Sequence, residues 1–220
     1  RKKEILEGIE ECLDKGWTGM GFKTVEIEEQ WKKYTNLPNA HFLSSNTVGL
    51  HLAVKILKHD NKWKDKDEII TTPLTFVSTN HAIKYENLTP VFADVDEQLC
   101  LDPVDVESKI TRKTKAIMFV GMGGNMGQYH KIKNICNKYN LKLILDAAHM
   151  AGTKIQKSFQ GFGTSYQQIG WDADVSIFSF QSVKNLPTAD SGMICFKNDE
   201  FMMMHGMMFI LFSQMFFRRF

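Results

Sequence analysis

Two kinds of apolar pattern alternate along the first 200 residues. Apolar residues spaced three or four positions apart predict amphipathic helices, and short continuous apolar runs predict strands that are covered on both faces. The pattern predicts helices over residues 5–15, 24–34, 47–57, 76–85, 103–109 and 129–139. It predicts strands over residues 41–44, 68–72, 90–94, 115–120, 141–145, 175–179 and 193–196.

This alternation of strands and helices is typical of βαβ units, so we expect an α/β fold with a mostly parallel sheet. In such sheets the functional groups gather beyond the carboxyl ends of the strands. The residues that follow each predicted strand are therefore the first candidates for a site.

Composition narrows the class of protein. The 220 residues are 43% apolar and 24% charged with a formal net charge of +2, which excludes wholesale disorder and gives no indication of a nucleic-acid or membrane partner. The four cysteines lie far apart without a C-x-x-C pair. We therefore expect reduced thiols, no metal site and a cytoplasmic protein.

Residues 201–220 have a different composition from the rest of the chain. They hold six of the twelve methionines and six of the sixteen phenylalanines, and their longest apolar run, 207–212, is too short to span a bilayer. We interpret this stretch as an atypical tail from a truncated or frameshifted end.

The first candidate site follows the strand at 41–44. Small polar residues, Ser45, Asn46 and Thr47, precede a helix there. Free N–H groups and the helix dipole at such a terminus favour a phosphate. The simpler alternative is that Ser45 or Asn46 only caps the helix.

The second candidate is Asp146, which follows a buried strand and precedes two alanines and His149. A carboxylate in such surroundings is costly unless a cation or N–H groups compensate it. A helix cap is the alternative. The third candidate is the strand end at Ser179 with Lys184 five residues further on. A lysine among apolar groups can form a Schiff base, although most lysines are simply solvated.

The fourth candidate is the loop from Gly121 to Gly127, which lies between a strand and a helix with Asp146 after the next strand. A dinucleotide-binding fingerprint has the same order of elements. Here Met126 occupies the place of the third glycine, so the match is imperfect.

Taken together and in order, seven motifs resemble the sugar-nucleotide aminotransferases known as the DegT/DnrJ/EryC1/StrS family, which depend on pyridoxal phosphate and have the type I fold. The motifs lie at residues 16–19, 44–53, 73–79, 90–96, 114–117, 146–149 and 178–193. The resemblance implies that residues 1–200 form the cofactor-binding large domain, a mostly parallel mixed sheet between helices, with an N-terminal helical segment over residues 1–35. The small C-terminal domain of the family would be missing.

The resemblance also implies the residues that hold the cofactor. Lys184 would carry it covalently and move the proton, and Asp146 would pair with its protonated pyridine nitrogen. Phe76 would stack on the ring, and His149 would contact the ring oxygen.

The cofactor phosphate would lie at the helix start, bound by Thr47 with Asn46 beside it and by the hydroxyl of Ser179. Gly19 and Gly21 would line the mouth of the pocket and contact substrate. Two departures stand out: Asn46 replaces the usual glycine, and the stretch 156–172 is longer than usual.

The function implied is transfer of an amino group, with glutamate as donor, to a nucleotide-linked keto-deoxysugar for amino-sugar and polysaccharide biosynthesis by a homodimer. Three alternatives remain open. A deoxysugar dehydratase of the same family typically has histidine in place of the lysine, so Lys184 argues against it. The others are an NAD-dependent oxidoreductase built on the loop from Gly121 to Gly127, and an inactive aminotransferase fragment.

Overall fold

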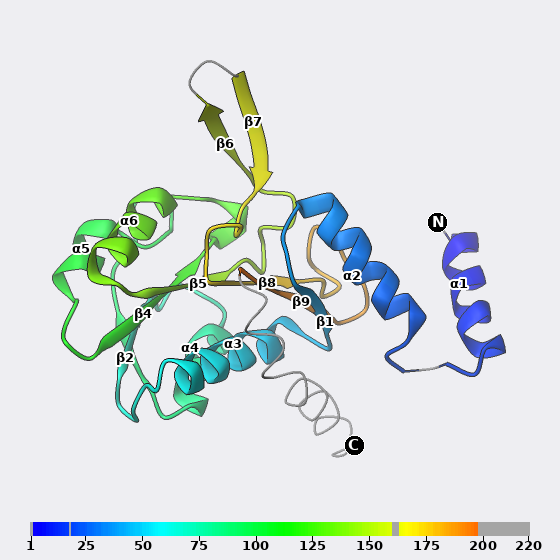
Figure 1. The fold of residues 1–220 in the computed structure, drawn as a ribbon, viewed down its shortest axis with the longest axis horizontal. Helices are drawn as coiled ribbons and strands as arrows, with labels where there is room; N and C mark the ends of the chain where they lie inside the picture. The colour runs from blue at the N-terminus through cyan, green and yellow to red at the C-terminus, as the bar shows by residue number, and fades with distance from the viewer. Residues whose placement is uncertain (1, 18, 160–162, 198–220) are drawn as a thin grey trace.

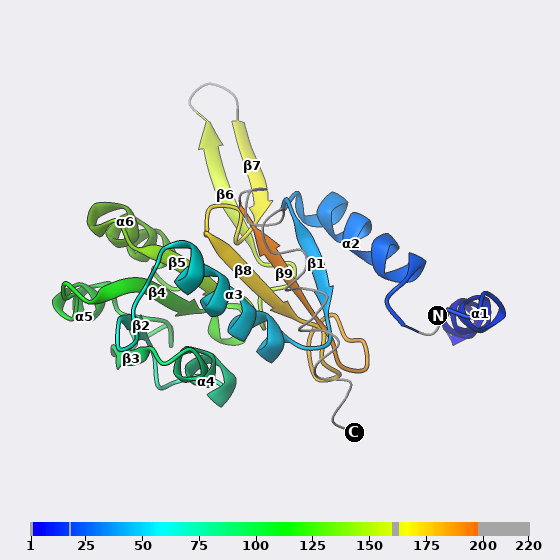
Figure 2. The same ribbon diagram turned by 60° about the horizontal axis from the view of Figure 1, so that its bottom comes forward.

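A seven-stranded sheet forms the centre of the computed structural model, which describes residues 2–17, 19–159 and 163–197 (Figures 1 and 2). The strand order is β1-β9-β8-β5-β4-β2-β3. Strand β9 runs antiparallel to both of its neighbours, and the other neighbouring strands of the sheet pair in parallel. The expected mostly parallel mixed sheet is therefore confirmed. The strands are β1 (Ala40–Leu43), β2 (Glu68–Thr71), β3 (Thr89–Phe92), β4 (Thr114–Val120), β5 (Lys142–Asp146), β8 (Val175–Ser179) and β9 (Gly192–Phe196).

Helices cover both faces of this sheet (Figures 1 and 2). Helices α3 and α4 pack on one face, and α2, α5 and α6 lie on the other. Their bounds are α2 (Phe22–Thr35), α3 (Asn46–Asp60), α4 (Val77–Tyr85), α5 (Pro103–Ser108) and α6 (Tyr129–Tyr139). Each agrees within a few residues with a helix predicted from apolar spacing.

The two-sided covering explains why the strands are continuous apolar runs. Consecutive strand residues point to opposite faces. Thus Ile69 belongs to the core beneath α3 and α4, whereas Ile70 belongs to the core beneath α5 and α6. The same alternation holds for Met118 and Phe119 in β4. Both faces need apolar side chains, so the pattern does not alternate with polar residues.

A separate two-stranded hairpin, β6 (Lys154–Phe159) and β7 (Gly163–Gln168), was not predicted from the sequence. It projects away from the sheet (Figures 1 and 2). Its strands pair mainly with each other, so they lack the apolar run that marks the strands of the central sheet. This hairpin accounts for most of the long stretch 156–172.

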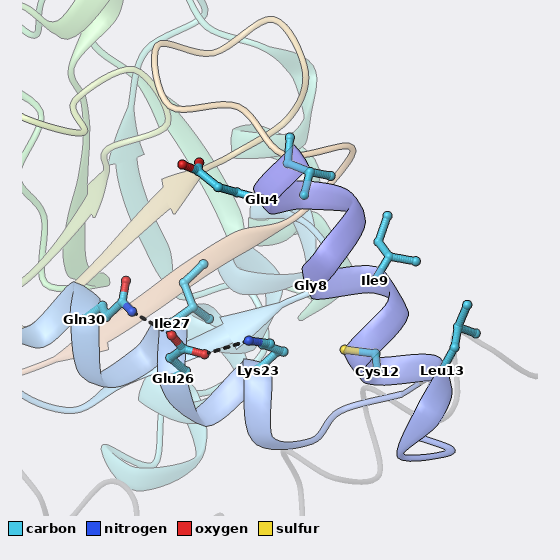
Figure 3. A pocket seen from close by; sticks show the side chains of 10 residues that line it. Glu4, Gly8, Ile9, Cys12, Leu13, Lys23, Glu26, Ile27 and Gln30 are labelled. Atoms are coloured by element: carbon cyan, nitrogen blue, oxygen red, sulfur yellow. Dashed lines mark hydrogen bonds and ion pairs between the residues drawn. The ribbon is translucent and has the colours of Figure 1, made fainter. Parts of the chain in front are cut away.

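The N-terminal helix α1 (Lys2–Asp14) has no buried residue. Ile9 and Leu13 are 52% and 62% exposed, and both line an open pocket that α1 shares with α2 (Figure 3). An ion pair of 2.8 Å between Glu11 and Lys23 links the two helices. The apolar side of α1 is thus left uncovered by the described residues.

All four cysteines are free. Burial raises the pKa of Cys136 and Cys195 to about 12, so these thiols behave as apolar core groups. Within the described ranges, no helix has the length and apolarity needed to cross a membrane. The expectation for the tail at 201–220 concerns residues outside the described part of the chain.

Candidate active site

A cavity of about 500 Å³ lies at the carboxyl-terminal edge of the sheet. It gathers side chains that are more than a hundred positions apart in the chain. Seven residues predicted from the sequence line it together: Asn46, Thr47, Phe76, Asp146, His149, Ser179 and Lys184. The candidates that follow the predicted strands therefore meet in one cavity, and their roles stay predictions.

Asp146 ends β5, the central strand of the sheet, and only 4% of it is exposed. Its Oδ2 accepts a hydrogen bond of 2.7 Å from the hydroxyl of Thr79. Its Oδ1 accepts bonds from the backbone N–H of Ala148 at 3.2 Å and the side-chain amide of Asn46 at 3.4 Å.

Burial raises the pKa of the Asp146 carboxyl, and these donors offset only part of that effect. No lysine, arginine or histidine of the described residues forms an ion pair with it. A buried carboxylate held by neutral donors favours a ligand that brings a cation or an N–H group.

The start of α3 forms the side of the cavity next to Asp146. Ser45 caps this helix, because its Oγ accepts from the backbone N–H of Val48 at 3.2 Å. The capping alternative is therefore correct for Ser45. Thr47 lines the cavity in the first turn, where N–H groups and the helix dipole favour an anion.

Asn46 lines the cavity, and its side-chain amide bonds to Asp146; its place beside a phosphate stays a prediction. Its Oδ1 is buried and has no hydrogen-bond partner among the described atoms. The backbone at this point is crowded, since a Cβ on Gly192 would lie 2.8 Å from Asn46 N. The structure thus places Asn46 between the helix start and the carboxylate.

Ser179 and Lys184 reach the cavity from the end of β8 and the turn that follows it. The turn is closed by a bond of 2.9 Å from the Lys184 backbone N–H to Gln181 O. Ser179 is buried, and Lys184 is partly exposed. No carboxylate in the described ranges forms an ion pair with Lys184. Its ammonium is therefore available to a ligand.

His149 is held by the glycine-containing loop that follows β4. The backbone N–H of Gly123 donates to His149 Nδ1 at 3.1 Å. Burial lowers the pKa of His149, and the positive charge of Lys184 lowers it further, while Asp146 opposes the shift. The ring is therefore biased towards its neutral form at neutral pH.

Phe76 precedes α4 and is 74% exposed, so its ring is an open apolar platform at the cavity. Thr79 lies three positions later, in the first turn of α4, and is fully buried. Thr79 belongs to the motif at residues 73–79, but the sequence alone predicted no role for it. Its spacing from Phe76 was the available signal.

Gly19 and Gly21 do not line the cavity; they lie in the loop between α1 and α2. Gly21 packs against the indole of Trp17, whose Nε1 donates to Met20 O at 2.7 Å. Their contact with substrate stays a prediction.

The loop from Gly121 to Gly127 lines the cavity at Gly121 and Met122 and packs against the segment that carries His149. Thr153 Oγ1 donates to Gly124 O at 3.0 Å, and a Cβ on Gly124 would lie 3.0 Å from His149 O. In the dinucleotide-binding fingerprint Asp146 would be the acidic residue, but here its carboxylate accepts a hydrogen bond from Thr79. These contacts do not favour the dinucleotide alternative.

Comparison with known proteins places the chain among aminotransferases. A model of the DegT/DnrJ/EryC1/StrS aminotransferase family matches residues 1–211. The chain is 33% identical over 212 residues to the spore coat polysaccharide biosynthesis protein SpsC of Bacillus subtilis, covering 93% of this chain and 51% of SpsC.

Several solved structures have a fold similar to that of this chain. The putative sugar aminotransferase Spr1654 of Streptococcus pneumoniae, in its PLP form, has a TM-score of 0.80 and 27% identity over 94% of this chain and 53% of its own. DesI, solved in the presence of its TDP-sugar product, has a TM-score of 0.75 and 25% identity over 91% of this chain and 48% of its own. The chain thus spans about half the length of the relatives it matches.

Proposed function

The chain belongs to the DegT/DnrJ/EryC1/StrS aminotransferase family, and we propose that it forms the cofactor-binding half of a pyridoxal-phosphate-dependent sugar aminotransferase. The observation that carries the proposal is one cavity that holds a buried carboxylate without a cation, Asp146, and a lysine without an ion-pair partner among the described residues, Lys184. Pyridoxal phosphate complements both, since it has a basic ring nitrogen and an aldehyde that reacts with an amine.

The other lining residues fit the remaining parts of this cofactor. Thr47 and the free N–H groups at the start of α3 would bind the phosphate, together with the buried hydroxyl of Ser179. Phe76 would stack on one face of the ring. His149 would meet the ring oxygen.

When bound, the cofactor supplies an electron sink for the carbon that gains or loses the amino group. The chain's own residues do the positioning. Asp146, held by Thr79 and Ala148, would keep a proton on the ring nitrogen. Lys184 would hold the cofactor at Nζ and, when released, its free amine would carry the proton of the 1,3-shift.

We propose a nucleotide-linked keto-deoxysugar as the amino acceptor and glutamate as the donor. DesI was solved with a TDP-sugar product and SpsC is named for polysaccharide biosynthesis, and both support this substrate class. We also propose that the protein acts as a homodimer. The exposed apolar side chains of Ile9 and Leu13 on α1 are consistent with an assembly. Sedimentation velocity on the chain would test that state.

The central test is covalent labelling. The chain is mixed with pyridoxal phosphate, reduced with borohydride, digested and mapped by mass spectrometry. We expect the label on the peptide that contains Lys184 and visible absorbance before reduction. The control is Lys184→Arg, which keeps the charge but should take no label at this site. Label on another lysine of the wild-type chain would refute the assignment of Lys184.

A further inference from the structure

The contact between Gly123 and His149 determines more than the position of the ring. A backbone N–H can only donate, so His149 Nδ1 must accept with its lone pair. A neutral imidazole that accepts at Nδ1 carries its proton at Nε2. Protonation of Nδ1 would set two N–H groups against each other. The Gly123 amide thus selects one tautomer and disfavours the imidazolium.

We propose that Gly123 is a positioning residue that keeps His149 neutral and protonated at Nε2, so that the cavity receives an uncharged hydrogen-bond donor. His149 lines the cavity, and Nε2 has no hydrogen-bond partner among the described residues. The proposal gives a role to the loop from Gly121 to Gly127, which the proposed function does not otherwise use.

The loop is built for this contact. Gly123 has φ of 62°, a left-handed conformation that glycine adopts without strain and that turns its N–H towards the histidine. Gly124 follows with φ of 85° and approaches His149 O too closely for a side chain to fit easily. Thr153 Oγ1 then anchors the loop through Gly124 O. The loop that carries the Gly123 N–H is therefore held by contacts with both His149 and Thr153.

Two charged groups near His149 could change its protonation state if no contact fixed that state. Asp146 and Lys184 act on the ring with opposite electrostatic effects. Without the Gly123 contact, the ring's charge would follow changes at these two groups. An uncharged donor stabilises a ring oxygen without transferring a proton to it. The identity of that acceptor rests on the proposed function, whereas the tautomer does not.

The test uses the 220-residue chain labelled with ¹⁵N-histidine and free of cofactor. Long-range ¹H–¹⁵N spectra distinguish protonated from unprotonated ring nitrogens, and the signals absent from His149→Gln identify His149. We expect Nδ1 unprotonated and Nε2 protonated at neutral pH, with titration below the ordinary histidine pKa of about 6.5. A protonated Nδ1 or an imidazolium at neutral pH would overturn the proposal.

Two variants separate the ends of the ring. Asparagine at 149 places an acceptor near the position of Nδ1, and glutamine places a donor near that of Nε2. In His149→Asn, we expect Gly123 amide exchange to stay slow; in His149→Gln, we expect it to become about tenfold faster, as for loss of one hydrogen bond. Circular dichroism confirms that both variants fold.

Equal exchange at Gly123 in the wild type and His149→Gln would contradict the anchoring role. The cofactor provides a separate readout: cofactor affinity should be better retained by His149→Gln than by His149→Asn. A chain that takes up no cofactor would refute the proposed function, whereas the tautomer would still be decided by the spectra of the cofactor-free chain.

Discussion

Thr79 donates its hydroxyl proton to Oδ2 of Asp146 over 2.7 Å, although 67 positions separate the two residues. The Oγ1 of Thr75 lies 2.8 Å from that of Thr79. When Asp146 is ionised it can only accept, so Thr79 donates its hydrogen bond to the carboxylate and Thr75 must donate to Thr79. Two hydroxyl groups therefore act in series to orient the carboxylate, and the Thr79 bond opposes the rise in its pKa that burial causes.

Replacing Thr79 with valine should weaken cofactor binding. Valine keeps the shape but removes the donor, so the pKa of Asp146 rises further and the carboxylate is less often ionised. We expect about a tenfold loss in affinity for pyridoxal phosphate, measured by absorbance titration. Thr79→Ser keeps the hydroxyl and should retain most of the affinity. Equal losses in the two variants would show that volume matters rather than the hydrogen bond.

Replacing Asp146 with asparagine should abolish amino transfer yet stabilise the cofactor-free fold. Burial raises the pKa of Asp146 in the folded chain above its unfolded value. The folded state therefore binds more protons than the unfolded state, and stability falls as pH rises through this interval. Removing the charge should increase the free energy of unfolding at neutral pH, measured by urea denaturation.

Repeating the comparison of the wild type with Asp146→Asn at lower pH tests the sign of the effect of pH on stability. Below the unfolded pKa of Asp146, the wild type is protonated in both states, so the advantage of Asp146→Asn should disappear. Asp102→Asn is the matched control, because Asp102 is an N-cap of α5 and asparagine caps equally well. A less stable Asp146→Asn at neutral pH would contradict the expectation.

The phosphate site can be tested without activity. Thr47→Val should lower affinity for pyridoxal phosphate roughly tenfold, because a hydrogen bond to a charged group is lost. Affinity for pyridoxal, which has no phosphate, should stay unchanged. Ser179→Ala should show the same selectivity, and Thr47→Ser should behave as the wild type. Losses of equal size for both aldehydes would place the phosphate elsewhere.

Gly192 should tolerate no side chain. A Cβ there would lie 2.8 Å from Asn46 N and Ser45 C and 2.9 Å from Phe178 O, all of which are backbone atoms. Gly192→Ala should therefore cost about 2–3 kcal/mol of stability through overpacking. Gly8→Ala is the contrast, since no atom lies within 4 Å and alanine favours the helix by about 1 kcal/mol. Similar thermal unfolding temperatures for the two variants would refute this prediction.

Local pattern was sufficient to predict most elements and several residues that meet in one cavity. Strands covered on both faces are apolar runs, so the strands of the central sheet were found, and α6 was predicted with the bounds it has in the structure. Asp146, Ser179 and Thr47 were found because each follows or lies near a strand end. The hairpin β6–β7 was missed because its strands lie outside the central sheet, where no apolar run is required.

Only the tertiary structure decided which groups meet. Asn46 and Asp146 are 100 positions apart and touch because α3, which begins at Asn46, packs across β9 and β8, and β8 is the neighbour of β5. Gly123 reaches His149 because β4 and β5 are neighbours. Apolar periodicity reports whether a segment is buried, not which strand lies beside it. Hydrogen-bond partners depend on that adjacency, so the surroundings of Asp146 and the tautomer of His149 could be derived only from the folded chain.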